Sequence, residues 1–244
     1  PIQTMLNPPA AATTLDFLRP LVSVDVVILT LREQQLQVLL VQRPNTPGEP
    51  FPDCWALPGG FVDIAQDQTL QDCALRKLRE KTGVSSPYLE QVGSWGDNQR
   101  DPRGWSITHV YVALLPHAAL QLAAGGNAEQ VRWMPVGADV TLAFDHASLL
   151  QAALERVRSK TEYTSLPLHL LPPTFTLSEL QQVYEIVLGR ALEKKAIRTR
   201  MLAADILQEA GAMKATGRRP AQLYRLQQPA GLFYFARSFE GGRD

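Results

Sequence analysis

The stretch from residue 55 to residue 84, WALPGGFVDIAQDQTLQDCALRKLREKTGV, holds the features that decide the fold. Its Pro58-Gly59-Gly60 step predicts a turn. Thr69 with Asp72 three residues later forms a capping box, so a helix is expected to begin after Thr69. The apolar stripe of this helix comprises Leu70, Cys73, Ala74 and Leu78. Gly83 stands where a helix end favours a left-handed residue, so the stretch predicts a loop followed by an amphipathic helix.

Strand-like segments flank this helix on both sides. Residues 22–31 and 36–43 precede it and are expected to form a hairpin. Further strands are predicted at residues 89–96, 105–116 and 130–136, and a helix at residues 147–158. A sheet interleaved with helices therefore predicts a mixed α/β domain over residues 21–159, preceded by an N-terminal extension of residues 1–20.

A second pattern follows in the last third of the chain. Thr176 and Glu179 form another capping box, and Gly189 ends the helix after it. A second helix is expected from Lys194 to Glu209, closed by Gly211. A basic turn at residues 217–220 and a strand at 221–226 complete the order helix, turn, helix, hairpin, which is typical of a winged helix-turn-helix. This domain is predicted to span residues 160–244.

The charges of the chain divide along the same line. The net charge of zero combines −4 over residues 1–159 with +4 over residues 160–244, and residues 190–225 alone carry nine cations against three anions. A local positive field of this kind suits a polyanion such as DNA. Charge alone does not distinguish that interpretation from a solvated basic face.

Several classes of protein are not indicated. There is no apolar run long enough to cross a bilayer, and no basic segment followed by an apolar run at the start of the sequence. Cys54 and Cys73 have no CxxC partner and no histidine cluster, which argues against a disulfide framework and against a structural zinc site. A cytoplasmic protein without membrane contact is expected.

The stretch around the first helix resembles the Nudix box, whose fold is an α/β/α sandwich. Gly60, Arg76, Leu78, Glu80, Gly83 and Val84 fit the pattern. Lys77 and Lys81 stand where Nudix hydrolases carry metal-binding glutamates, and the loop before the helix offers the neutral Gln66 and Gln68 where an acid is expected. Lysines repel a divalent cation. We therefore expect neither a metal site nor catalytic residues, and a protein that is not an enzyme.

A ligand site is predicted from cations, glycines and aromatic side chains in the same domain. The Arg100–Trp105 element, RDPRGW, is compatible with a simple turn. Guanidinium forks also match phosphate oxygens, and aromatic planes stack on bases. The predicted ligand-binding residues are Arg43, Trp55, Gly59, Gly60, Phe61, Glu80, Arg100, Asp101, Arg103 and Trp105.

A DNA-binding surface is predicted at the start of the second helix of the C-terminal pattern. Arginine there can pair with guanine, whereas lysine and threonine can hold phosphates. The expected helix contacts are Lys194, Lys195, Arg198, Thr199 and Arg200, and the expected wing contacts are Arg218, Arg219, Gln222 and Tyr224. A basic helix with purely structural duties is the alternative.

Residues 21–226 as a whole resemble the NrtR family, the Nudix-related transcriptional regulators of NAD metabolism. The resemblance implies a homodimeric repressor of NAD biosynthesis and salvage genes, which binds palindromic double-stranded DNA and is released by ADP-ribose or a related nucleotide acting as effector, without a cofactor. Two alternatives stay open: an ADP-ribose pyrophosphatase with an accessory DNA-binding domain, and a regulator of this family that senses a sugar. The aromatic tail after Leu226 is expected to dock on a domain or on a dimer partner.

Overall fold

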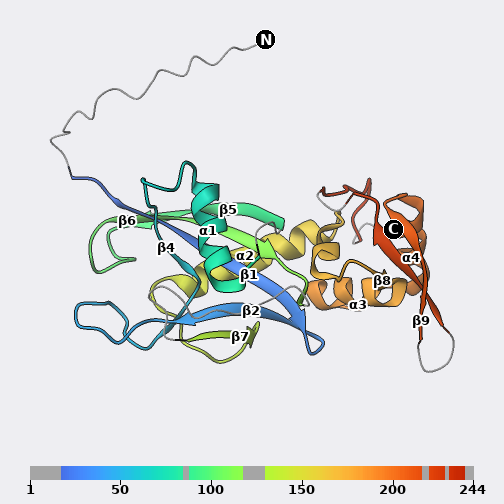
Figure 1. Ribbon diagram of the computed structural model, residues 1–244, viewed down its shortest axis with the longest axis horizontal. Coiled ribbons are helices and arrows are strands. Elements are labelled where there is room, and N and C mark those ends of the chain that lie inside the picture. The colour runs from blue at the N-terminus through green and yellow to red at the C-terminus, as the bar shows by residue number, and fades with distance from the viewer. Residues whose placement is uncertain (1–17, 85–87, 118–129, 216–219, 229–230, 240–244) are drawn as a thin grey trace, which may run out of the picture.

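The computed structural model describes residues 18–84, 88–117, 130–215, 220–228 and 231–239. The chain forms two domains that lie end to end, the sheet-containing N-terminal domain and a smaller C-terminal domain (Figure 1). In the described residues, no helix is both long enough and apolar enough to span a membrane. Both cysteines are free thiols.

The N-terminal domain is built on one mixed sheet. Its strands are β1 (Leu21–Arg32), β2 (Gln35–Gln42), β3 (Trp55–Ala56), β4 (Gly59–Phe61), β5 (Tyr88–Asp97), β6 (Ser106–Leu114) and β7 (Val131–Pro135). The path through the sheet runs β3-β2-β1-β6-β5, with β4 paired to β1 and β7 paired to β2. β1 is parallel to β6 and antiparallel to β2 and β4. The long hairpin predicted from the sequence is the β1–β2 pair.

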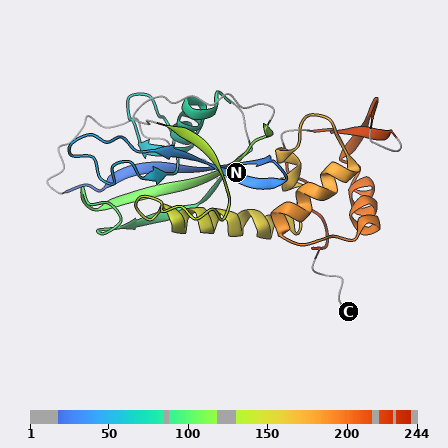
Figure 2. The same cartoon turned by 90° about the horizontal axis from the view of Figure 1, so that it is seen from below.

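Strand β1 separates two apolar cores because its side chains alternate between the faces of the sheet. Val24, Val26 and Ile28 pack under helix α1 (Leu70–Thr82). Val27 and Leu29 pack against helix α2 (His146–Thr161) on the opposite face. One helix on each face makes the domain the α/β/α sandwich that was predicted. Helix α2 lies along the sheet and continues into the C-terminal domain (Figure 2).

Local sequence signals fix helix α1 as predicted. The Thr69 hydroxyl accepts a hydrogen bond from the amide of Asp72, and the Asp72 carboxylate accepts one from the Thr69 amide. Gly83 ends the helix at φ 72°. A left-handed residue at this point favours glycine because it has no Cβ.

The C-terminal domain has the winged helix-turn-helix order. After the 3₁₀ helix η2 (Leu166–Leu170) come β8 (Phe175–Thr176), α3 (Leu177–Leu188), α4 (Lys194–Ala203), β9 (Leu207–Lys214) and β10 (Ala221–Leu226). The three strands form one sheet in the order β8-β10-β9. The predicted capping box of α3, Thr176 with Glu179, and its glycine end at Gly189 are both present.

The predicted end of the second helix in this domain is wrong. Helix α4 stops at Ala203 instead of Glu209, because Asp205 adopts a left-handed backbone with φ 51°. Ile206 and Leu207 were assigned by their spacing to the apolar face of the helix. Leu207 instead begins the first wing strand, where it pairs with Leu226, and Ile206 directly precedes that strand. Gly211, predicted to close the helix, lies within β9 at φ 68°.

The two domains share a continuous core. Side chains of α2 and η2 join the core of the sandwich to that of the winged helix, which includes Phe175, Tyr184 and Met201. Around this core Tyr184 donates a hydrogen bond to the Thr164 carbonyl at 2.8 Å, Arg190 pairs with Glu162, and Gln182 hydrogen-bonds to Gln34 at the tip of the β1–β2 hairpin. The domains are therefore packed against each other rather than joined by a bare linker.

Candidate ligand cavity and nucleic-acid interface

A cavity of about 840 Å³ opens on the sandwich domain between the ends of β1 and β2, strand β4, helix α1 and the loop after β5. Its floor is formed by Gly59 and Gly60. A Cβ on Gly59 would come within 2.1 Å of Asp25 Oδ1 and 2.6 Å of the Val24 carbonyl oxygen. Such distances are far below van der Waals contact, so this close approach of β4 to β1 requires glycine.

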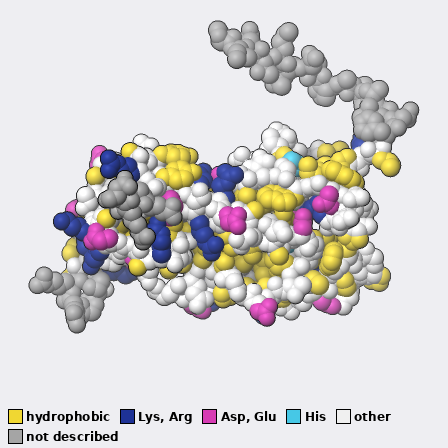
Figure 3. Space-filling view, turned by 180° about the vertical axis from the view of Figure 1, so that it is seen from behind, with side chains coloured by type: hydrophobic (Ala, Val, Ile, Leu, Met, Phe, Trp, Pro, Cys, Tyr) yellow, Lys and Arg dark blue, Asp and Glu magenta, His cyan; other side chains and the backbone are white. Residues whose placement is uncertain are grey.

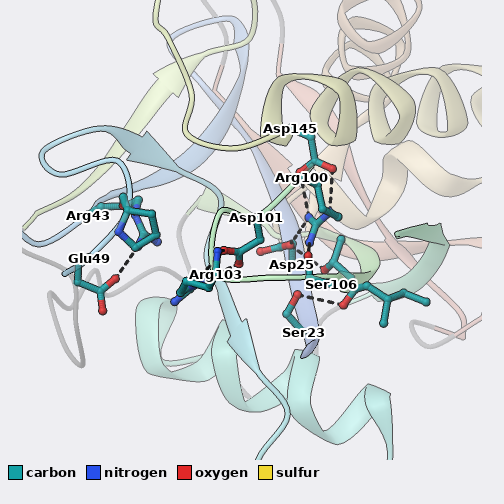
Figure 4. Close-up of polar contacts among 12 residues, drawn as sticks. Ser23, Asp25, Arg43, Glu49, Arg100, Asp101, Arg103, Ser106 and Asp145 are labelled. Carbon is teal, nitrogen blue, oxygen red and sulfur yellow. Dashed lines mark hydrogen bonds and ion pairs between the residues drawn. The ribbon is translucent and has the colours of Figure 1, made fainter. Parts of the chain in front are cut away.

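A buried polar network holds the back of the cavity (Figure 4). Arg100, which is 9% exposed, donates two hydrogen bonds to Asp145 at 2.9 and 3.0 Å and one to Ser106 at 3.2 Å. Its guanidinium also lies 3.9 Å from Asp25, whose carboxylate accepts a hydrogen bond from Thr108 at 2.7 Å. The arginine therefore ties the loop after β5 to the N-terminus of α2, and its fork is already engaged by protein groups.

His146, the first residue of α2, completes this network. Its Nδ1 accepts a hydrogen bond from the Leu57 amide at 3.0 Å, so Nδ1 carries no proton, and its Nε2 lies 3.7 Å from Asp25 Oδ1. Burial lowers the pKa of His146, because desolvation disfavours the imidazolium more strongly than Asp25 favours it. A neutral imidazole that donates from Nε2 is thus the form that fits the site.

The mouth of the cavity combines arginines with aromatic rings. The Arg43 guanidinium lies 4.7 Å from the ring centroid of Phe144, and the Arg103 guanidinium lies 4.9 Å from that of Phe61. Phe144 holds a left-handed backbone with φ 55°, which is unusual for a bulky residue and occurs preferentially at functional sites. Cations beside aromatic faces can bind a phosphate and stack a base.

Both mouth arginines are already oriented by carboxylates (Figure 4). Arg43 pairs with Glu49 at 2.7 Å, and Arg103 pairs with Asp101 at 2.8 Å. Desolvation lowers the pKa of Arg43. Burial of Asp101 opposes its ionisation, but the hydrogen bonds from Arg103 outweigh this, and the pKa of Asp101 is lowered. These ion pairs fix the arginine side chains at the rim before any ligand binds.

Helix α1 presents its charged face to the same cavity. Glu80 accepts a hydrogen bond from Arg76 at 3.2 Å on one oxygen, and Lys77 Nζ lies 3.8 Å from the other. A Cβ on Gly60 would lie 3.1 Å from Lys77 Nζ, so this ammonium lies directly above strand β4. Lys81 is only 7% exposed, and desolvation lowers its pKa. This part of the cavity is cationic and suits an anionic group.

A second surface lies at the far end of the molecule. The N-terminal part of α4 carries a cleft lined by Glu193, Lys194, Lys195, Arg198, Thr199 and Leu202. Lys194, Lys195, Arg198 and Thr199 are exposed, while Ile197 and Met201 on the opposite side of the helix are fully buried. The Glu193 carboxylate caps the helix by accepting hydrogen bonds from the Lys195 and Ala196 amides. Lys and Arg side chains gather at this end of the molecule (Figure 3).

Comparison with known proteins gives the same division of the chain. Residues 19–153 match the Nudix domain family, and residues 167–226 match the NrtR DNA-binding winged helix domain. The chain is 50% identical over 227 residues to the ADPR responsive transcriptional repressor NtrR of Acinetobacter baylyi, covering 92% of this chain and 89% of the relative. The chain belongs to the NrtR family of Nudix-related transcriptional regulators.

Solved structures of another NrtR protein have the same fold. Shewanella oneidensis NrtR in complex with a 27mer DNA superposes with a TM-score of 0.81 at 43% identity, over 89% of this chain and 98% of that one. The Nudix domain of the same protein in complex with ADP-ribose superposes with a TM-score of 0.52 at 46% identity, over 57% of this chain and 90% of that one. The predicted family and fold are therefore confirmed.

The Nudix fold implies a divalent metal ion, and the residues on α1 do not fit one. Two positive charges about 4 Å apart repel by about 4 kcal/mol at an effective dielectric near 20, and a divalent ion doubles that value. Lys77 occupies the position beside Glu80, and both oxygens of Glu80 already face cations. In the described residues, no group of three or more His, Cys, Asp or Glu side chains is arranged to hold a metal ion.

The predicted absence of an acid from the loop before α1 is wrong. Asp67 stands between the two glutamines that the spacing singled out, and it accepts hydrogen bonds from Arg76 at 2.6 and 2.8 Å. These bonds lower the pKa of Asp67, and the same carboxylate helps burial to raise the pKa of the neighbouring Cys73 thiol to about 12. Asp67 is thus a structural partner of Arg76, one residue away from the position inferred by counting.

The cavity contains most of the predicted ligand-binding residues. Those that line it are Arg43, Gly59, Gly60, Phe61, Glu80, Arg100, Asp101 and Arg103. The predictions for the two tryptophans are not supported by their positions: Trp55 packs against the core of the sheet, and Trp105 is half exposed and lies over Gly96. The structure adds Asp25, Phe144 and His146, which sequence reasoning missed. Only the Asp145-His146 pair before a predicted helix gave a signal that could have identified any of them.

Of the predicted DNA-binding residues, some lie on the exposed face of α4 and others do not. Lys194, Lys195, Arg198 and Thr199 share the exposed face of α4, whereas the expectation that Arg200 joins them is wrong. Arg200 points to the other side, where its guanidinium lies between the rings of Phe235 and Phe239. In the wing, Tyr224 packs against the core and the Gln222 amide hydrogen-bonds to backbone carbonyls. Arg218 and Arg219 lie outside the described residues.

Proposed function

We propose that this protein is a DNA-binding transcriptional repressor of NAD biosynthesis and salvage genes, released from its operator by ADP-ribose or a closely related nucleotide. One observation carries the proposal: a single chain combines a cavity of cations and aromatic rings with an exposed basic helix. Its relatives in the family include an ADP-ribose-responsive repressor and a protein crystallised with DNA and, in its Nudix domain, with ADP-ribose.

The chemistry of the cavity supports ADP-ribose as effector. Lys77 and Lys81 offer cations to the anionic pyrophosphate, and Phe61 and Phe144 offer rings beside which adenine can stack. The neutral His146 and the buried carboxylate of Asp25 can hydrogen-bond to ribose hydroxyls deeper in the cavity. The protein itself thus supplies the positive charge that a metal ion would otherwise bring to the diphosphate.

The same residues support a sensor rather than a hydrolase. Hydrolysis in Nudix enzymes depends on carboxylates that gather a divalent cation, and this helix presents Lys77 and Lys81 at two of those positions. Bound ADP-ribose is therefore expected to dissociate without being hydrolysed. In the proposed mechanism, the free energy of ligand binding is used only to shift the protein toward an arrangement that binds DNA less tightly.

The exposed face of α4 supports a major-groove contact, in which Arg198 reads bases and Lys194, Lys195 and Thr199 hold phosphates. A homodimer is part of the proposal, because a palindromic operator matches a twofold-symmetric protein. Light scattering on the free protein and on its complex with DNA tests this stoichiometry.

The function is tested by selecting duplexes from a randomised pool and titrating the selected site with protein at several salt concentrations. A palindromic site bound with a steep salt dependence, of slope about −0.9 per phosphate neutralised, is expected. Thermal shifts with ADP-ribose, ribose 5-phosphate and neutral sugars then identify the effector. A thermal shift with neutral sugars alone would identify a sugar, not ADP-ribose, as the effector. A DNA affinity that does not change with salt concentration would contradict the DNA-binding proposal.

A separate assay tests catalysis directly. ADP-ribose incubated with the protein and Mg²⁺ or Mn²⁺ is followed by chromatography for release of AMP. Release of AMP is expected to be no faster than the uncatalysed background hydrolysis of ADP-ribose. Metal-dependent release of AMP that Glu80→Gln abolishes would instead identify an ADP-ribose pyrophosphatase.

A further inference from the structure

The chain after the wing returns across the C-terminal domain to the end of helix α2. We call residues 231–239 the return segment. Its backbone pairs with the residues just after α2: Phe233 exchanges hydrogen bonds with Ser165 at 2.9 Å, and the Phe235 and Phe239 amides donate to the Tyr163 and Glu162 carbonyls at 2.8 and 3.0 Å. The return segment is therefore anchored to α2, which belongs to the core of the sandwich domain.

The aromatic side chains of this segment enclose one cation of helix α4. The Arg200 guanidinium lies 4.4 Å from the ring centroid of Phe235 and 4.0 Å from that of Phe239. Phe239 in turn packs edge-on against the fully buried Tyr184 of α3. A desolvated arginine over aromatic faces gains more from the contact than an exposed one. Arg200 Nη2 is buried without a hydrogen-bond partner among the described residues, so the rings are its principal contact.

Helix α4 has few other anchors. It spans 10 residues, and only Ile197 and Met201 are fully buried. Both belong to the core cluster that also contains Tyr184 and Val187 of α3. Lys194, Lys195, Arg198 and Thr199 are instead exposed on the outer face of the helix. With so small an apolar contact, a third attachment through Arg200 limits how far the helix can tilt or rotate against α3.

We propose that Arg200 is a positioning residue for DNA binding: held between Phe235 and Phe239, it fixes the angle at which α4 presents its basic face. The proposal rests on the proposed function, because it assigns a role within the same DNA-binding surface. In this proposal, the return segment connects helix α4 to the end of α2. Arg200 itself does not contact DNA.

The test compares Arg200→Ala, Phe239→Ala and their double variant in DNA titrations with the full-length protein. Each single change is expected to weaken binding to the selected operator about fivefold to tenfold, the range of one desolvated cation–π contact. Because the two side chains act as a unit, the double variant is expected to be no weaker than the poorer single variant. Phe239→Tyr, which keeps the ring, is expected to restore binding.

Arg198→Ala is the matched control, since it removes the same side chain from the outward face of the same helix. Its effect is expected to multiply with that of Phe239→Ala, and because Arg198 is assigned to base reading, its loss is also expected to relax discrimination between the operator and altered sites. The affinity for ADP-ribose is expected to be unchanged in every variant. Amide exchange over residues 197–203 is expected to accelerate in Phe239→Ala relative to α3, a readout that does not depend on DNA.

Two results would overturn the inference. One is wild-type DNA affinity, with unchanged amide exchange in α4, for Phe239→Ala. The other is an Arg200→Ala effect that multiplies with Phe239→Ala and reduces the salt slope, which would make Arg200 a direct phosphate contact. Failure of the proposed function would give a different result. The wild-type protein itself would then bind no duplex, whereas amide exchange in α4 would still report whether the contact of Arg200 with Phe235 and Phe239 holds the helix.

Discussion

Reversing the charge of Lys77 is the sharpest test of the cationic part of the cavity beside helix α1. Lys77 Nζ lies above strand β4 and 3.8 Å from Glu80. At such a distance one pair of unit charges interacts by about 4 kcal/mol at an effective dielectric near 20. Solvent in an open cavity screens most of this, which leaves about 1.4 kcal/mol, or tenfold in affinity, for an ammonium beside a phosphate.

Lys77→Glu removes this attraction and adds a repulsion of similar size, so ADP-ribose is expected to bind about 100-fold more weakly. Lys77→Gln, which only removes the charge, is expected to lose about tenfold. Arg79→Glu is the matched control, because Arg79 lies on the exposed side of the same helix and does not line the cavity. It changes the net charge equally and is expected to leave the affinity nearly unchanged.

Isothermal titration calorimetry in the presence of EDTA measures these affinities, and circular dichroism checks that each variant is folded. Equal losses of ADP-ribose affinity in Lys77→Glu and Arg79→Glu would show that the net charge of the protein, not the position of Lys77, determines binding. Wild-type affinity in Lys77→Glu would refute the argument that the lysine takes the place of a metal ion beside the pyrophosphate.

Gly59→Ala places a Cβ within 2.1 Å of Asp25 and is expected to abolish ADP-ribose binding in calorimetry, whereas Gly231→Ala, which meets nothing within 4 Å, is expected to leave it intact. Burial lowers the pKa of His146, so the unfolded chain binds a proton first, and the free energy of unfolding is expected to fall as pH drops below about 6.5; thermal melts of His146→Asn are expected to show a weaker pH dependence, and an unchanged one would contradict this. Arg198→Ala is expected to weaken operator binding by about 1–3 kcal/mol in a fluorescence anisotropy titration without changing ADP-ribose affinity, and an equal loss of both would indicate a folding defect.

Local sequence signals predicted most of the fold because each has a short-range physical cause. The capping boxes at Thr69 and Thr176 and the glycines at positions 83 and 189 set helix ends through contacts within one turn. The nearly continuous apolar run of residues 26–31 reflects a central strand buried on both faces. The end of α4 escaped prediction because Ile206 and Leu207 fit the helical spacing equally well, and only pairing with β10 makes the chain from Leu207 onward a strand.

The candidate site was less accessible to sequence reasoning. Side chains near the glycine turn and in the Arg100–Trp105 element could be identified by type, and most of them line the cavity. Asp25 could not, because a carboxylate in the middle of an apolar strand gains its role only through Thr108 and Arg100, more than 70 residues away in the chain. Arg200 was assigned to DNA for the same reason: its charge was visible, and its aromatic partners were distant in the sequence.

Metal-free release of DNA is measured by titrating ADP-ribose into the complex of the protein with a labelled operator in the presence of EDTA and following fluorescence anisotropy. The anisotropy is expected to fall to the value of free DNA, and ADP-ribose is expected to be recovered unchanged. Release that requires added Mg²⁺ or Mn²⁺, or no release at saturating ADP-ribose, would show that the protein is not a metal-independent ADP-ribose sensor.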